Sequence, residues 1–232
     1  MLMNMKDLLA VANEHNFAVP AFNVSSNMIL KGVMHTCEEM QAPVIIAIHP
    51  DELSFVEDSF VKAVIEEAHK ATVPVCIHLD HGAKFEQVLR AIQDGFTSVM
   101  IDGSKHPFEE NMRLTKEVVE YAHSKGVVVE AELGKLAGIE DNIKVDARNA
   151  TFTDPEEAAE FVAKTGVDSL AIAIGTSHGA YKFTADQCTR NEKGILVPPP
   201  LRFDVLEEVS KRLPGFPIVL HGSSSVPQEY VK

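Results

Sequence analysis

The chain has 232 residues, of which 45% are hydrophobic and 24% charged, so it is long enough to bury one sizeable core. Its 34 acidic and 21 basic residues give a formal net charge of −13, which argues against a nucleic-acid groove as the main function of the surface. No uncharged apolar run is long enough to span a membrane, and the first ten residues do not resemble a secretory signal. Three cysteines without a C-x-x-C motif disfavour a disulfide scaffold and a zinc ribbon, and we therefore expect a cytoplasmic protein.

Short β-branched runs alternate along the chain with segments of helical periodicity. This alternation is typical of a parallel sheet built from strand-helix-strand units. The middle runs, such as V-I-I-A-I and V-C-I-H-L, are apolar nearly throughout, as expected of strands that are covered on both faces. The predicted strands are residues 18–23, 44–48, 75–79, 98–101, 127–133, 169–174 and 218–220.

Two of the intervening helices have clear start and stop signals. Asp154 is a predicted N-cap, with Pro155 in the first helical position, and this helix should run to about Thr165. A second helix is predicted between residues 107 and 125 and should stop at Gly126. Its apolar stripe consists of Phe108, Met112, Val119 and Ala122.

Parallel strands that alternate with helices form either an open doubly wound sheet or an eight-stranded barrel. No G-x-G-x-x-G follows the first strand, and polar residues gather at the carboxyl ends of most strands, so we predict a (β/α)8 TIM barrel. We expect residues 1–232 to form one such domain with seven of the eight strands. The stretch 183–201 is predicted to be irregular, and a loop of that length usually lies near a site or is mobile.

Polar or ionisable residues follow each predicted strand at its carboxyl end. Because the ends of neighbouring parallel strands lie within side-chain reach of one barrel axis, His81, His178 and His221 can converge although they are far apart in sequence. Three imidazoles with an open fourth position form a catalytic zinc arrangement. A lone histidine of this kind is more often satisfied by a backbone carbonyl, but three at strand ends favour a metal site. The residues at strand ends are Asn23, His49, Asp80, His81, Asp102, Glu132, His178 and His221.

Three of the residues at predicted strand ends are carboxylates. Asp80, directly before His81, can exchange a proton with a substrate that the metal holds. The alternative is that Asp80 only supports the imidazole or caps a helix. Asp102 and Glu132 are either further metal ligands or caps of the helices that follow, and the residues alone leave both interpretations open.

Two glycine-containing loops, at residues 175–179 and 222–225, follow the sixth and seventh strands. Barrels commonly bind phosphate in this region through backbone N–H groups and hydroxyls. Because the net charge is strongly negative, a bound phosphate would need such a local anion site.

Five motifs together resemble the class II, metal-dependent ketose-bisphosphate aldolases, which include the fructose-bisphosphate aldolases. The resemblance covers nearly the whole chain, and the motifs occur in the family's order at compatible spacings. They are I-H-L-D-H-G at 77–82, S-V-M-I-D-G-S at 98–104, V-E-A-E-L-G at 129–134, A-I-G-T-S-H-G at 173–179 and V-L-H-G-S-S at 219–224.

The resemblance implies a role for each matched residue. His81, His178 and His221 would bind Zn²⁺, and Asp80 would exchange a proton with the aldehyde oxygen of the substrate. Asp102 and Glu132 match ligands of a second or alternate metal position, and a monovalent cation is a further possibility in this family. Glu140 falls where the family has a loop glutamate that removes a proton from the donor ketone, although the residues around it depart from the usual glycine-glycine-acidic pattern. The phosphate of dihydroxyacetone phosphate would contact Gly179, Gly222, Ser223 and Ser224, and Asn23 would line the mouth of the site.

The implied reaction is reversible aldol cleavage of fructose 1,6-bisphosphate to dihydroxyacetone phosphate and glyceraldehyde 3-phosphate. No lysine lies within the predicted strands, which leaves the metal route rather than a Schiff base. The alternatives are the tagatose epimer as substrate, a metal-dependent barrel hydrolase, and a non-catalytic fragment. The resemblance also implies a homodimer or homotetramer.

Two features depart from the family pattern. A small hydroxyl residue or glycine commonly follows the second strand in the family and meets the second phosphate, whereas this chain has His49 and Pro50. An eighth strand should follow the seventh, yet the sequence stops at Lys232. We therefore expect a longer natural chain that supplies the eighth β/α unit.

Overall fold

The computed structural model describes residues 1–135, 137–140, 143–145, 151–178, 188–190, 192, 194–197, 199–223 and 226, with only the backbone described for 137–140 and 143–145. The chain divides into two compact units. The first consists of Met1–Ala131 and Lys164–Ser169, and the second of Glu132–Ala163 and Leu170–Lys232.

The first unit is built on parallel strands that follow one another in sequence order. Strands β2 to β5 are buried along their whole length, as their Val- and Ile-rich sequences predict. The observed strands confirm the first five predicted ones, although β3 continues three residues further than the apolar run indicated. They are β1 (Ala21–Asn23), β2 (Val44–Ile48), β3 (Val75–Gly82), β4 (Ser98–Ile101) and β5 (Val128–Leu133).

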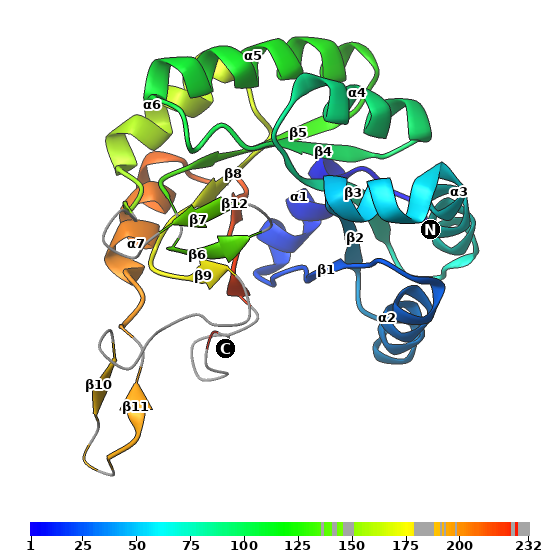
Figure 1. Cartoon of the computed structure of the whole chain (residues 1–232), viewed down its shortest axis with the longest axis horizontal. Coiled ribbons are helices and arrows are strands. Elements are labelled where there is room, and N and C mark those ends of the chain that lie inside the picture. The colour runs from blue at the N-terminus through cyan, green and yellow to red at the C-terminus, as the bar shows by residue number, and fades with distance from the viewer. Residues whose placement is uncertain are drawn as a thin grey trace. The chain divides into compact units, whose positions relative to one another are not determined.

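Helices α2 to α5 lie along the outer side of these strands, whereas α1 packs where the strands begin (Figure 1). Met5 and Leu8 of α1 form a buried cluster with Ile45, Cys76 and Val128 from the first residues of three strands. Helix α1 therefore covers this end of the strands. Burial of each large apolar side chain contributes about 1.5–3 kcal/mol to the stability of this packing. The helices are α1 (Met5–His15), α2 (Asn27–Met40), α3 (Pro50–Lys70), α4 (Phe85–Asp94) and α5 (Phe108–Ser124).

The structure confirms the predicted extent of α5. The prediction of which α5 side chains are buried is wrong in part. Asn111 and Thr115 are buried, whereas Phe108 and Met112 are only half-buried. The reason is a local polar contact, in which Thr115 Oγ1 donates to Asn111 Oδ1 at 3.3 Å. A Cβ on Gly103 would lie 2.2 Å from that same oxygen, so the helix packs its asparagine against a glycine of the preceding loop.

Helix α3 starts immediately after β2 and bends once. The carboxylate of Glu52 accepts from the His49 N–H at 3.1 Å, and the His49 ring accepts from the Asp51 N–H at 3.2 Å. His49 and Pro50 therefore form a helix start. The bend is at Glu57, which has φ 61° and ψ 170°. Only glycine adopts this conformation readily, and it costs other residues about 1–3 kcal/mol.

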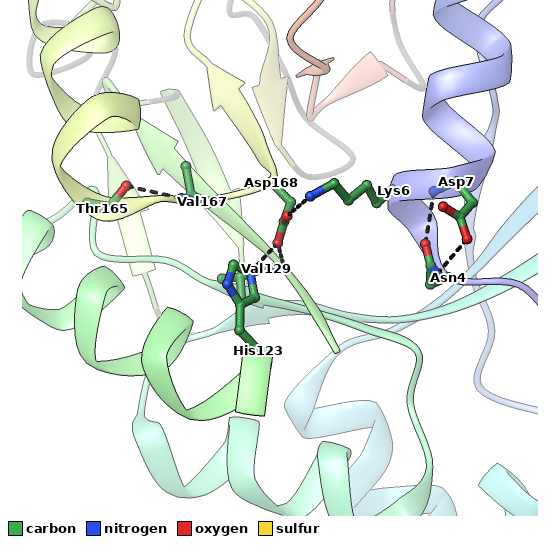
Figure 2. A network of polar contacts seen from close by, with 8 residues as sticks. All are labelled: Asn4, Lys6, Asp7, His123, Val129, Thr165, Val167 and Asp168. Carbon is green, nitrogen blue, oxygen red and sulfur yellow. Dashed lines mark hydrogen bonds and ion pairs between the residues drawn. The ribbon is translucent and has the colours of Figure 1, made fainter. Parts of the chain in front are cut away.

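A polar network ties the strand starts together at the α1 end of the first unit (Figure 2). The Asp168 carboxylate accepts hydrogen bonds from Lys6 Nζ at 3.2 Å, His123 Nε2 at 2.7 Å and the Val129 N–H at 2.9 Å. Its side chain is only 6% exposed. One carboxylate thus joins α1, the end of α5 and the start of β5, a role that the sequence pattern did not reveal.

The second unit contains the two remaining strands of the predicted barrel. Strands β8 (Ser169–Ile172) and β12 (Ile218–Val219) pair in parallel, with Val219 opposite Ala171. The predicted α6 (Pro155–Thr165) is confirmed, and Asp154 Oδ1 accepts from the Glu156 N–H at 2.7 Å as the N-cap should. The last described helix is α7 (Phe203–Arg212).

Two small sheets accompany these strands. In the first, β6 (Ala137–Glu140) pairs antiparallel with β7 (Ile143–Val145) and parallel with β9 (Ser177–His178). The second is a hairpin of β10 (Thr189–Arg190) and β11 (Leu196–Val197), so the prediction of an irregular stretch at 183–201 is wrong for these residues. Gly194 makes the turn possible with φ 74°, and its carbonyl accepts from Arg190 Nη1 at 2.7 Å.

These elements give an α/β chain in which parallel strands alternate with helices, as predicted for the barrel class. In the part of the chain that the structure describes, no helix has both the length and the apolar character needed to cross a membrane.

Candidate active site

An unusual backbone conformation lies at the carboxyl end of β3. The pairing of β3 with β4 shifts register between Leu79 and Gly82, which marks a bulge at Asp80 and His81. His81 has φ 49°, in the left-handed region, where a side chain costs about 1–2 kcal/mol. Its N–H donates to Met100 Sδ at 3.3 Å. A strained backbone at a predicted metal ligand is consistent with a functional site.

Four of the predicted site residues meet at this end of the first unit. Asn23 Nδ2 donates to Asp80 Oδ2 at 2.8 Å, which links the ends of β1 and β3. The other Asp80 oxygen lies 3.7 Å from His81 Nε2, and His81 Nδ1 hydrogen-bonds to Asp102 Oδ2 at 3.2 Å. Asp80 and His81 are both buried. The carboxylates and the imidazole therefore form one connected polar group.

Asp102 is held as an anion by its partners. Burial alone would raise its pKa, but hydrogen bonds from the His81 ring and from the Ser104 N–H, at 2.9 Å, outweigh this effect and hold the pKa below its usual range. A charged carboxylate on one ring nitrogen orients a metal-binding imidazole, so this contact fits a metal ligand at His81.

The helix-cap alternatives for the three carboxylates are not what the structure shows. Asp80 lies within β3 and Glu132 lies buried within β5. Asp102 precedes α5 by several residues, and its second oxygen closes a turn at Ser104 instead.

A second buried polar layer lies beneath Asp80 on the same strands. His78 Nδ1 and Ser98 Oγ share a hydrogen bond of 2.8 Å, and His78 Nε2 lies 3.7 Å from Glu130 Oε2. Neither Ser98 nor Glu130 was predicted from the sequence to belong to the site. Strand periodicity could have indicated Glu130. It precedes Glu132 by two positions, and side chains two positions apart lie on the same face of a strand.

The second unit brings together two of the predicted histidines. His178 ends β9, and His221 follows β12. Their ring centroids are 6.0 Å apart and the ring planes meet at 83°. Both rings are half-buried. Strand β6, which ends at Glu140, runs parallel to β9 with Gly138 opposite His178; the side chain of Glu140 lies outside what the structure describes.

The turn after β12 approaches the backbone of β9 closely. Gly222 has φ 68°, and a Cβ there would lie 2.8 Å from the Ser177 carbonyl oxygen, so only glycine fits this position. Ser223 Oγ donates to the Leu220 carbonyl at 2.6 Å, and the Ser223 carbonyl accepts from the Val226 N–H at 2.9 Å. The predicted phosphate contacts Gly179 and Ser224 lie outside the described residues.

Comparison with known proteins gives a consistent result. Residues 3–232 match the family model described as fructose-bisphosphate aldolase class-II. A protein of Treponema pallidum named fructose-bisphosphate aldolase is 48% identical over 100% of this chain and 71% of its own length. Proteins of the same name from Thermus caldophilus and Giardia intestinalis are 45% and 44% identical, over 100% and 98% of this chain and 72% and 67% of their own lengths.

Solved structures support the same assignment. The YdjI aldolase from Escherichia coli K12 is 36% identical with a TM-score of 0.80, over 98% of this chain and 74% of that one. A putative fructose-1,6-biphosphate aldolase from Coccidioides immitis is 31% identical with a TM-score of 0.83, over 98% and 76%. Both have the TIM-barrel fold, which confirms the predicted fold class. This chain belongs to the class II fructose-bisphosphate aldolase family.

Proposed function

We propose that this protein catalyses the reversible aldol cleavage of fructose 1,6-bisphosphate to dihydroxyacetone phosphate and glyceraldehyde 3-phosphate. The observation that carries the proposal is the polar group at the ends of β1 and β3, in which Asn23 bonds to the buried Asp80 beside the buried His81, in a chain whose relatives are named fructose-bisphosphate aldolase. The group combines a metal-ligand side chain with a carboxylate placed for proton transfer.

The family is metal-dependent, and we propose that His81, His178 and His221 hold a Zn²⁺ ion. Asp102 and Glu132 are proposed ligands of a second or alternate metal position. Imidazole and carboxylate donors suit zinc, and the hydrogen bond from His81 to Asp102 fits the support that a metal-bound imidazole requires. When bound, a divalent cation supplies Lewis-acid polarisation of the substrate ketone.

The chain's own acid and base groups then complete the reaction. In the cleavage direction, Asp80 accepts the proton of the C4 hydroxyl while the C3–C4 bond breaks and C4 becomes the aldehyde. The electron pair of that bond passes to the ketone-bearing fragment, and Glu140 is proposed to return a proton to its C3 carbon. The amide of Asn23 fixes one oxygen of Asp80 at 2.8 Å, so the other oxygen is presented to substrate.

The phosphate of the ketone fragment needs a local anion site because the chain has a net charge of −13. We propose that backbone N–H groups and hydroxyls of Gly179, Gly222, Ser223 and Ser224 provide it. The tight turn at Gly222 supports this assignment, because positive-φ turns direct successive N–H groups toward one point.

The test is a cleavage assay on the purified protein before and after chelation with EDTA. Activity should be lost on chelation and restored by Zn²⁺, and His81→Ala should abolish it while the surface control His123→Ala should not. Unchanged cleavage after thorough chelation contradicts the metal assignment. Parallel assays with fructose and tagatose bisphosphates decide between the two epimers, and faster cleavage of the tagatose epimer would replace the substrate named above.

The remaining proposals concern the whole protein. We propose that both units belong to one barrel domain and that the protein is cytoplasmic and assembles as a homodimer or homotetramer. Sedimentation velocity at micromolar concentration measures the assembly, and a monomer throughout the concentration range would contradict that part of the proposal.

A further inference from the structure

The bend in α3 separates a short first segment from the rest of the helix. Residues 50–56 begin directly after β2 and precede the strained Glu57, and residues 58–70 continue beyond it. Leu53 anchors the first segment in the core, whereas the Phe55 side chain is 82% exposed. The first segment therefore has two buried side chains, Pro50 and Leu53, and further contacts help to keep its orientation.

Arg90 of α4 bridges the bend with a single guanidinium group. Its Nη2 donates to the Leu53 carbonyl at 3.4 Å, on the near side of the bend. Its Nε donates to Asp58 Oδ1 at 3.1 Å, on the far side. The hydrogen bond from Arg90 also lowers the pKa of the Asp58 carboxyl. The planar fork of arginine holds its donors in fixed directions toward both partners, whereas the ammonium group of lysine is a compact charge on a flexible stem.

The bridged segment starts beside the catalytic end of the sheet. Strand β2 lies between β1 and β3, with Ala47 opposite Asn23 and Ile48 opposite Leu79. His49 follows Ile48 directly, and Asp80 follows Leu79, so the two lie at the same level. Because Asp80 is proposed to act on the aldehyde oxygen, residues 49–56 follow the strand next to the one whose end would meet the aldehyde half of the substrate.

We propose that Arg90 is a positioning residue for the aldehyde half of the substrate, holding residues 49–56 in place by bridging Leu53 and Asp58 across Glu57. The inference rests on the proposed aldolase function. A strained conformation such as that of Glu57 persists only where surrounding contacts enforce it, and the guanidinium bridge is such a contact.

The test compares two reactions that use different halves of the substrate. Arg90→Lys and Arg90→Met are assayed for fructose bisphosphate cleavage and for exchange of a hydroxymethyl (C1) proton of dihydroxyacetone phosphate with deuterated water, which needs no aldehyde. We expect kcat/KM for cleavage to fall about tenfold, mainly through KM, while exchange stays within about twofold of wild type. An equal fall in both reactions, or no fall in either, overturns the positioning role.

Two further variants sharpen this test. Arg113→Met is the matched control, because Arg113 makes similar exposed ion pairs with Glu110 and Glu117 within α5, and it should change neither reaction. Adding Glu57→Gly to Arg90→Met should recover part of the cleavage loss, since glycine adopts the bend without strain. Failure of wild-type protein to exchange dihydroxyacetone phosphate would count against the aldolase function itself, and is thereby distinguished from failure of the Arg90 proposal.

Discussion

In the first unit, the hydrogen bonds His81–Asp102 and His123–Asp168 lie at opposite ends of the parallel strands, and they differ in nearly every respect except composition. At the carboxyl ends, His81 Nδ1 lies 3.2 Å from Asp102, on a left-handed backbone within a bulge. At the starts of the strands, His123 Nε2 lies 2.7 Å from Asp168, and the histidine is 41% exposed on a regular helix.

The difference lies in what surrounds each pair. Asp168 is also bonded by Lys6 and by a backbone N–H, so its oxygens serve to join three elements (Figure 2). The His81 pair instead adjoins a second carboxylate, Asp80, on a backbone that departs from regular strand geometry. The shorter hydrogen bond thus belongs to the structural pair, and the pair with the strained and buried histidine has the features of a reactive site.

The largest expected effect is on cleavage activity, and it should distinguish His81 from His123. His81→Asn should lower cleavage activity by about a thousandfold or more, because loss of a ligand removes several kcal/mol of metal stabilisation. His123→Asn should leave activity within about twofold. Metal content by mass spectrometry and cleavage rates measure both, and equal losses in the two variants would show that the comparison is mistaken.

The next effect concerns Asp80, which joins the His81 pair and has no counterpart beside His123. Asp80→Asn should keep the metal but lower turnover by about 10²–10⁴, the range for loss of a general acid–base group. If metal is lost as well, Asp80 acts as a ligand rather than in proton transfer.

A smaller effect is expected for the carboxylate that supports His81. Asp102→Asn should weaken metal affinity about 10–100-fold, as for other groups that orient metal ligands. The dissociation constant is measured by competition with a fluorescent chelator. Asp168→Asn serves as the control here and should leave this constant unchanged; an unchanged constant in Asp102→Asn would remove Asp102 from the metal site.

The smallest expected effects belong to the structural pair and appear only in stability. Asp168→Asn should lower the free energy of unfolding by about 1–3 kcal/mol, because charged hydrogen bonds to a buried carboxylate are lost. Lys6→Ala should cost no more than about 1 kcal/mol, since the Lys6 side chain is 67% exposed. Urea titration checks both values, and a fall in turnover of the folded Asp168→Asn protein would contradict a purely structural role.

Local patterns in the sequence were sufficient to predict most of the helices and strands. The apolar runs at 44–48 and 98–101 coincide with β2 and β4, because both faces of these strands are covered and their sequences show it. Strand β3 was predicted too short, since its last three residues are Asp80, His81 and Gly82. Their polarity conceals a strand that continues through a bulge.

The candidate site was predictable only as a set of residue types. A polar residue after each parallel strand indicated Asn23, Asp80 and Asp102, because strand ends converge in this class of fold. The left-handed backbone of His81, the bridge from Arg90 across α3 and the network around Asp168 have no periodic signature. Each depends on contacts between elements far apart in sequence, which no local pattern contains.

The positive φ of His81 also restricts which residues position 81 accepts, independently of metal chemistry. Asparagine and aspartate adopt this backbone more readily than other residues, whereas β-branched side chains are strongly disfavoured there. A saturation library at this position should therefore divide into three classes. Histidine alone should be active, asparagine and aspartate should be inactive but well folded, and valine and isoleucine should be depleted already at the level of soluble expression.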